Sequence, residues 1–137
     1  MNRIKEKIKE LEEYLDYLLE IVPKTLEEYS RDNLRKAACE RYFEKVIEAV
    51  TDIAFMIIVK KKWIIPEDDA DAFRIVADKN VISEELHKKL KSAKGMRNFL
   101  AHQYGRVDDE KVYEAITEEI EADVQQFITE VKKNILK

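Results

Sequence analysis

The first segment of the chain carries an apolar stripe that is typical of an amphipathic helix. Its hydrophobic residues recur at steps of three and four, with mostly charged residues between them, and they are Ile4, Ile8, Leu11, Leu15, Leu18 and Val22. Pro23 ends the pattern, because proline cannot continue a helix. The spacing therefore predicts a first helix that ends just before Pro23.

The same periodicity predicts a long second helix. It begins between Thr25 and Asp32, with Ser30 and Asp32 as candidate N-caps, and it runs to about Lys62. Its final turns, residues 55–59, continue the apolar side onto the polar side, so they need cover from both directions. A second subunit and the short helix that follows in the same chain are equally good sources of that cover.

Three further helices follow in the sequence. A short helix is predicted up to about Asn80, because a proline followed by three acidic residues suits a helix N-terminus. Ser83 is the candidate N-cap of the next helix, which runs to about His102. The last helix begins near Asp108 or Asp109 and again repeats apolar residues at steps of three and four.

Composition supports an all-α fold. The 137 residues include only 2 Gly and 2 Pro, while 39% are charged and 45% hydrophobic, a bias that excludes sandwiches, barrels and most α/β folds. Four substantial helices and one short helix, joined by short loops, favour an antiparallel up-and-down bundle. We expect one domain that spans residues 1–137.

The apolar runs and the single cysteine indicate a cellular compartment. The longest unbroken apolar run, Ile53 to Val59, is far shorter than the roughly 18 residues that cross a bilayer, so no membrane segment is expected. Cys39 is the only cysteine, which leaves no intrachain disulfide and no zinc site. We therefore predict a cytoplasmic protein, and its net charge of −4 argues against indiscriminate binding to nucleic acid.

Positive charge is nevertheless concentrated in one place. No acidic residue occurs between Glu85 and Asp108, whereas this stretch holds Lys88, Lys89, Lys91, Lys94, Arg97 and Arg106. A solvated helix face is the ordinary explanation for such lysines. Arg97 differs, because it interrupts the apolar stripe of its own helix and its guanidinium needs a partner. That partner is either a carboxylate, Glu48 or Asp52, or an anionic substrate.

The string R-N-F-L-A-H-Q-Y-G, residues 97–105, resembles the R-x-x-x-x-H-x-Y motif of the HepT branch of the HEPN superfamily. Residues 40–54 are similar to the central helix of that family. The resemblance implies a HEPN-type homodimeric bundle that acts as a toxin ribonuclease, with a composite site from both subunits. It also implies a nucleotidyltransferase antitoxin of the MntA type, which silences the nuclease by transferring AMP to the motif tyrosine, Tyr104.

The motif residues suit RNA cleavage without a metal ion or cofactor. A histidine titrates near neutral pH, so His102 is the candidate base for the ribose 2′-hydroxyl. Arg97 would stabilise the negative charge that grows on the phosphoryl oxygens. Asn98 lies four residues before His102 on the same face, so its amide could orient the imidazole or hold a phosphate; a surface asparagine without a role is equally consistent.

Lys91, Lys94 and Arg106 are the candidate contacts to the RNA backbone, with mere solubility as the alternative for the lysines. Two other functions also fit the sequence. A non-catalytic bundle could bind a nucleotide or substrate for a separate nucleotidyltransferase, and a structural dimer could use the basic residues to dock a protein. The presence of both Arg97 and His102 favours the nuclease.

Overall fold

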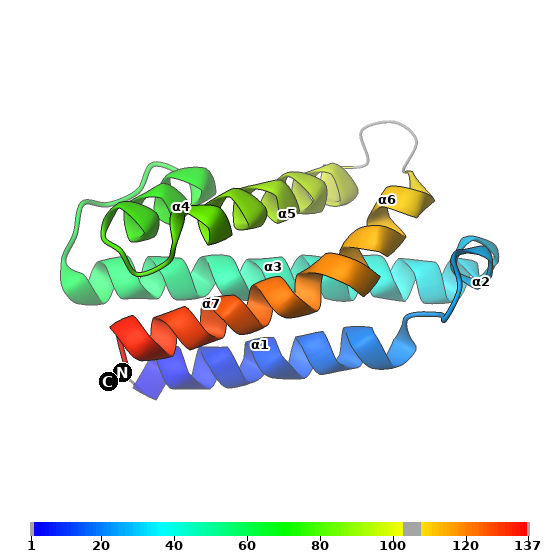
Figure 1. Ribbon diagram of the computed structural model, residues 1–137, viewed down its shortest axis with the longest axis horizontal. Helices are drawn as coiled ribbons and strands as arrows, with labels where there is room; N and C mark the ends of the chain where they lie inside the picture. The colour runs from blue at the N-terminus through cyan, green and yellow to red at the C-terminus, as the bar shows by residue number, and fades with distance from the viewer. Residues whose placement is uncertain (1, 103–107, 137) are drawn as a thin grey trace.

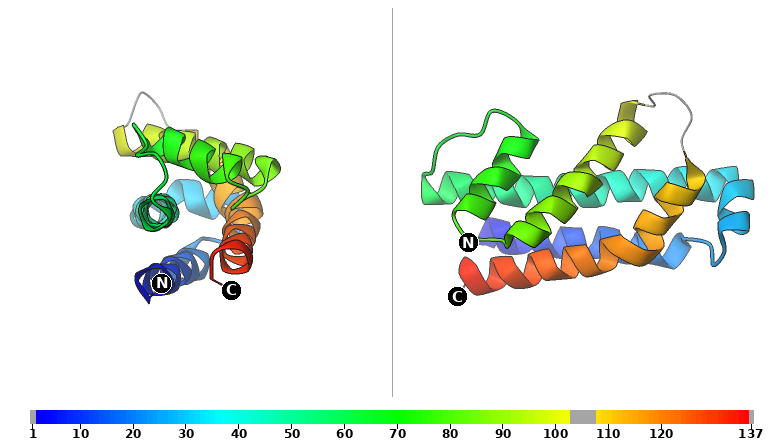
Figure 2. Two further views of the ribbon diagram at one scale, coloured as in Figure 1. Left: turned by 90° about the vertical axis from the view of Figure 1, so that its left-hand side faces the viewer. Right: turned by 45° about the horizontal axis from the view of Figure 1, so that its top comes forward.

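The computed structural model describes residues 2–102 and 108–136, apart from the side chain of His102. Four long helices alternate in direction along the bundle (Figure 1): α1 (Asn2–Ile21), α3 (Asn33–Lys61), α5 (Glu84–His102) and α7 (Ile120–Asn134). Seen from the end, they surround a common centre (Figure 2). The described residues contain no strand, which confirms the predicted all-α antiparallel bundle.

The first helix buries the side that its sequence pattern predicts. Ile4, Ile8, Leu11, Leu15 and Leu18 are all buried, and α1 packs mainly against α3. The removal of each such side chain from water contributes about 1.5–3 kcal/mol to folding. The helix ends at Ile21, so the predicted stop before Pro23 is confirmed.

A short helix, α2 (Leu26–Arg31), precedes the long central helix and was not predicted. Thr25 caps α2 and Asp32 caps α3, each accepting the backbone N–H three residues ahead, at 3.1 and 3.0 Å. Asp32 is thus confirmed as an N-cap, whereas Ser30 lies inside α2 and the interpretation of Ser30 as a cap was wrong. In α2 only Tyr29 is buried, which is too little to produce a periodic apolar pattern.

The predicted short helix and the cap of the following helix are confirmed. The short helix is α4 (Asp69–Asp78), whose N-cap Asp68 accepts a backbone N–H at 2.8 Å. Ser83 caps α5 by accepting the N–H of Leu86 at 3.1 Å. The short helix α4 packs against both α3 and α5.

The far end of α3 keeps an uncovered apolar surface. Ile57 and Ile58 are buried, but Phe55 and Met56 are only half-buried, and Val59 is 73% exposed. An open groove of about 380 Å³ runs between these three residues and the start of α1. The short helix α4 therefore covers only part of this segment.

The last predicted helix is interrupted by a π-turn. It consists of α6 (Asp109–Glu114), a π-helical turn (Ala115–Glu119) and α7, and Asp108 caps its start. The buried residues Val112, Ile116, Ile120 and Val124 recur at steps of four. A regular α-helix turns about 400° in four residues, which is about 40° more than a full turn. Apolar residues at steps of four therefore drift gradually around the helix. The wider π-turn takes up part of this drift and keeps the apolar side toward the core.

Candidate active site

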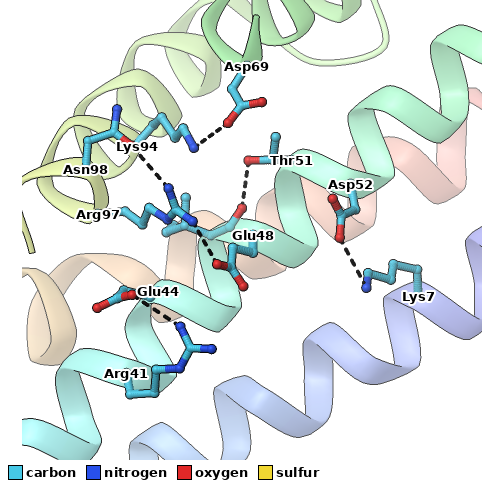
Figure 3. Close-up of polar contacts among 11 residues, drawn as sticks. Lys7, Arg41, Glu44, Glu48, Thr51, Asp52, Asp69, Lys94, Arg97 and Asn98 are labelled. Carbon is cyan, nitrogen blue, oxygen red and sulfur yellow. Dashed lines mark hydrogen bonds and ion pairs between the residues drawn. The ribbon is translucent and has the colours of Figure 1, made fainter. Parts of the chain in front are cut away.

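The candidate site lies where α5 crosses the middle of α3. Arg97 is on α5, five residues before His102, which is the last residue of this helix. Its Nη2 donates to Glu48 Oε1 at 2.7 Å, and the Arg97 side chain is 21% exposed (Figure 3). Of the two carboxylates predicted as candidate partners, Glu48 is therefore the one that pairs with Arg97. Asp52 pairs instead with Lys7 of α1 at 3.2 Å.

Asn98 completes the surroundings of the guanidinium. Its Oδ1 accepts a hydrogen bond from Arg97 Nη1 at 3.3 Å (Figure 3). The Nε of Arg97 is buried and has no hydrogen-bond partner within the described part of the chain. The structure thus brings together Arg97 and Asn98 of the predicted set. The predicted contact of Asn98 with the His102 imidazole concerns a side chain outside the described residues.

The described residues that were predicted to contact RNA have different environments in the structure. Lys91 is exposed on α5. Lys94 is only 7% exposed, and its Nζ lies 2.5 Å from Asp69 Oδ2 at the start of α4 (Figure 3). The expectation that Lys94 faces solvent to follow an RNA backbone was therefore wrong, because α4 covers this position and supplies its carboxylate partner. Arg106 lies outside the described residues.

Asp69 is the residue of this region that sequence reasoning missed. It belongs to an acidic run at the start of α4, and acidic residues are favourable at a helix N-terminus whether or not they have an ion-pair partner. Only the packing of α4 on α5 shows that it pairs with Lys94.

The last turn of α5 and the segment after it hold the remaining motif residues. His102 is the final residue of α5, and the C-terminal end of a helix favours a positive charge there. Tyr104, the predicted AMP acceptor, lies outside the described residues. The described part of the chain contains no group of three or more His, Cys, Asp or Glu side chains that could hold a metal ion.

The environment of the cysteine and the hydropathy of the described helices give no sign of another function. Cys39 is buried, and burial raises the pKa of its thiol to about 11, so the reactive thiolate is scarce at neutral pH. Among the described helices, none has the length and hydropathy that a bilayer crossing requires.

Comparison with known proteins supports the resemblance seen in the motif. The family model described as "Ribonuclease HepT-like" matches residues 4–131. A putative RNase of Archaeoglobus fulgidus is 38% identical over 86 residues, which is 63% of this chain and 64% of that protein. The mRNA nuclease HepT of Shewanella oneidensis is 32% identical over 89 residues, 65% of this chain and 66% of that protein. The chain thus spans just under two thirds of each of these two relatives.

A solved structure shares the fold over almost its whole length. The tri-AMPylated HEPN toxin of Shewanella oneidensis, in complex with MNT antitoxin, superposes with a TM-score of 0.89 at 24% identity. The match covers 96% of this chain and 97% of that one. The bundle described above is therefore the fold of a HEPN toxin.

Proposed function

Because the chain belongs to the ribonuclease HepT-like family, we propose that it is the toxin ribonuclease of a toxin and antitoxin pair and that it cleaves RNA without a metal ion. One observation carries the proposal: a half-buried guanidinium, held at 2.7 Å by a carboxylate of the central helix, lies on the helix that ends at His102. Fixed guanidinium groups stabilise the charge of a transferring phosphoryl group. The names of two relatives, a putative RNase and an mRNA nuclease, agree with this activity.

In the proposed reaction His102 takes the proton of the ribose 2′-hydroxyl. The 2′-oxygen then attacks the neighbouring phosphorus, a new O2′–P bond forms and the P–O5′ bond breaks. Arg97 stabilises the added negative charge on the phosphoryl oxygens, and the proton held by His102 passes to the leaving 5′-oxygen. Lys91 and Arg106 contact the RNA backbone.

Cleavage of an RNA oligonucleotide by the full chain, purified without its antitoxin, tests this function. We expect cleavage to persist in EDTA and to be abolished by His102→Ala. His87→Ala is the matched control, because His87 is the only other histidine and lies near the opposite end of α5. If magnesium is required, or His102→Ala cleaves at the wild-type rate, the nuclease assignment is wrong and a non-catalytic, nucleotide-binding partner of a nucleotidyltransferase becomes the better reading.

We further propose that a nucleotidyltransferase antitoxin of the MntA type silences the chain by AMP transfer to Tyr104. The phenolic oxygen would attack the α-phosphorus of ATP and release pyrophosphate. The AMP phosphate would then compete with RNA for Arg97. The tri-AMPylated toxin found with MNT antitoxin supports this proposal.

Intact-mass spectrometry after co-expression with such an antitoxin tests the modification. The wild-type chain should gain one or more AMP increments, and Tyr104→Phe should gain none. Tyr113→Phe is a suitable control, because the Tyr113 hydroxyl is already bonded to the Pro23 carbonyl at 2.7 Å. AMP on another residue would refute the assignment.

We propose that the protein acts in the cytoplasm as a homodimer of one-domain chains spanning residues 1–137. The uncovered surface at Phe55, Met56 and Val59 supports a dimer, since a second copy would remove it from water. Light scattering at micromolar concentration should give twice the monomer mass. A monomer would remove the composite site.

A further inference from the structure

We propose that Glu48 is a positioning residue for RNA cleavage, which holds the Arg97 guanidinium in the orientation that the scissile phosphate requires. The inference rests on the proposed function and assigns a role to a residue outside the R-x-x-x-x-H-x-Y motif. It starts from the 2.7 Å contact between Arg97 Nη2 and Glu48 Oε1 (Figure 3).

The hydrogen bonds that the guanidinium makes within the protein leave N–H donors for a phosphate. A guanidinium has five N–H hydrogens, one on Nε and two on each Nη. In Arg97 the Nε is buried, Nη2 donates to Glu48 and Nη1 donates to Asn98. Among the described residues this leaves one hydrogen on Nη1 and one on Nη2. Arginine binds phosphate with two parallel N–H···O bonds, so the remaining pair is the number that a phosphate takes.

Glu48, rather than Asn98, fixes the direction of these hydrogens. The bond to Asn98 is longer, 3.3 Å, and Asn98 is the next residue on the same helix, so it cannot hold Arg97 relative to the rest of the bundle. Glu48 comes from α3, where Ile47, Ala49 and Val50 are at most 1% exposed. A side chain anchored on such a buried element holds its partner more precisely than one on a loop.

The charge of Glu48 predicts which kinetic constant it affects. A carboxylate 2.7 Å from the guanidinium repels an approaching phosphate, so it cannot improve RNA affinity through its charge. Its benefit is orientation, which acts on the chemical step. Loss of Glu48 should therefore lower kcat while KM stays the same or falls, whereas a merely structural residue would not produce this split.

Kinetics of the full chain, free of antitoxin, on one RNA oligonucleotide test the proposal. We expect Glu48→Ala to lower kcat about tenfold without raising KM. Glu48→Gln keeps an acceptor oxygen at the same reach and should retain kcat within about threefold. Glu48→Asp keeps the charge but withdraws it from Nη2, so its kcat should fall as in Glu48→Ala. Melting of each variant, followed by circular dichroism, verifies the fold.

Glu44→Ala is the matched control. Glu44 lies one turn earlier on α3 and pairs with Arg41 at 3.3 Å, so its removal changes the charge equally without touching Arg97 (Figure 3). This control should keep the wild-type kcat and KM. An equal loss in Glu44→Ala would make the effect one of general charge and overturn the proposal.

Two other results separate the inference from the proposed function. If the wild type cleaves RNA through His102 and Glu48→Ala is as fast or faster, the inference alone is overturned. If the wild type shows no cleavage that depends on His102, the proposed function fails and the positioning role fails with it.

Discussion

Two cations on the same helix, three residues apart, pair with carboxylates of different helices, and the comparison contrasts a covered cation with the one proposed to act in cleavage. Lys94 pairs with Asp69 of α4 at 2.5 Å, and Arg97 pairs with Glu48 of α3 at 2.7 Å. The Lys94 side chain is 9% exposed and that of Arg97 is 21% exposed. Under the function proposed above, an ion pair does not by itself mark a residue as structural. The two cations differ in exposure, and the guanidinium of Arg97 is the more accessible of the two to a ligand.

The partners of the two cations explain this difference. Asp69 is the first residue of α4, so its bond to Lys94 ties the short helix to α5. Glu48 belongs to the central helix, and its bond to Arg97 leaves one hydrogen on each Nη among the described contacts. Both bonds tie α5 to a neighbouring helix, but only Arg97 keeps the exposure that the proposed binding of an anion requires.

The largest effect should follow the loss of the planar guanidinium. Arg97→Lys keeps the positive charge but removes the fork of parallel donors, so we expect RNA cleavage to fall by about 100-fold or more. The melting temperature should stay within a few degrees of that of the wild type. Lys94→Arg, the converse change, should cleave RNA at a rate close to that of the wild type. Equal losses in both variants would erase the distinction between the two cations.

A smaller effect, on stability rather than cleavage, is expected for Lys94→Met. This change keeps the apolar stem but leaves Asp69 without its partner. Because the Asp69 side chain is 42% exposed and water can hydrate it, the loss should be about 2 kcal/mol, below the 3–5 kcal/mol of a fully buried pair. Urea unfolding measures this loss. The exposed control Lys91→Met should change the free energy of unfolding by less than about 0.5 kcal/mol.

The cleavage rate of Lys94→Met completes this comparison. It should remain within about twofold of the wild-type rate, since no proposed step uses the ammonium group. A variant with unchanged stability and impaired cleavage would instead place Lys94 among the RNA contacts.

The smallest effect concerns Asp123 of α7, a carboxylate that is 9% exposed and has no ion pair within the described segments. Burial raises the pKa of Asp123 above its ordinary value of 3.8, and nearby Lys89 partly offsets this. The native state therefore holds this proton more tightly than the unfolded chain does. Its contribution to stability is complete below pH 3.8 and is lost as pH rises through the raised pKa.

Asp123→Asn removes this pH dependence. The variant should be more stable than the wild type at pH 7, and the two should converge near pH 3. Melting temperatures measured across this range provide the check. A variant that is less stable at pH 7 would show that the ionised carboxylate has a stabilising partner, as Lys94 does.

The sequence predicted those parts of the fold that leave a local signal. Pro23, Asp32 and Ser83 mark helix boundaries through their own backbone chemistry, and the structure confirms all three. The short helix α2 was missed because six residues with one buried side chain make no periodic pattern. The π-turn at 115–119 was missed because packing, rather than residue type, decides it.

The candidate site shows the same division. The position of Arg97 on an apolar stripe predicted that it needs a partner, and Glu48 was one of the two carboxylates named. For Lys94 there is no such signal in the sequence, because a lysine within a basic stretch has the same sequence context whether it is exposed or buried. Its burial depends on α4, which is about 20 residues away in sequence, and only tertiary structure reveals such contacts.

The π-turn between α6 and α7 makes one place in the protein unusually tolerant of a change in length. Its wider hydrogen-bonded ring holds one residue more than the α-helical ring on either side. Deletion of one residue there, such as Thr117 or Glu118, would convert the turn to regular helix while Val112 and Val124 both keep their places in the core. The same deletion elsewhere in this helix would rotate every later side chain by about 100° and turn its apolar side toward water. Natural length variation within this helix should therefore concentrate at residues 115–119.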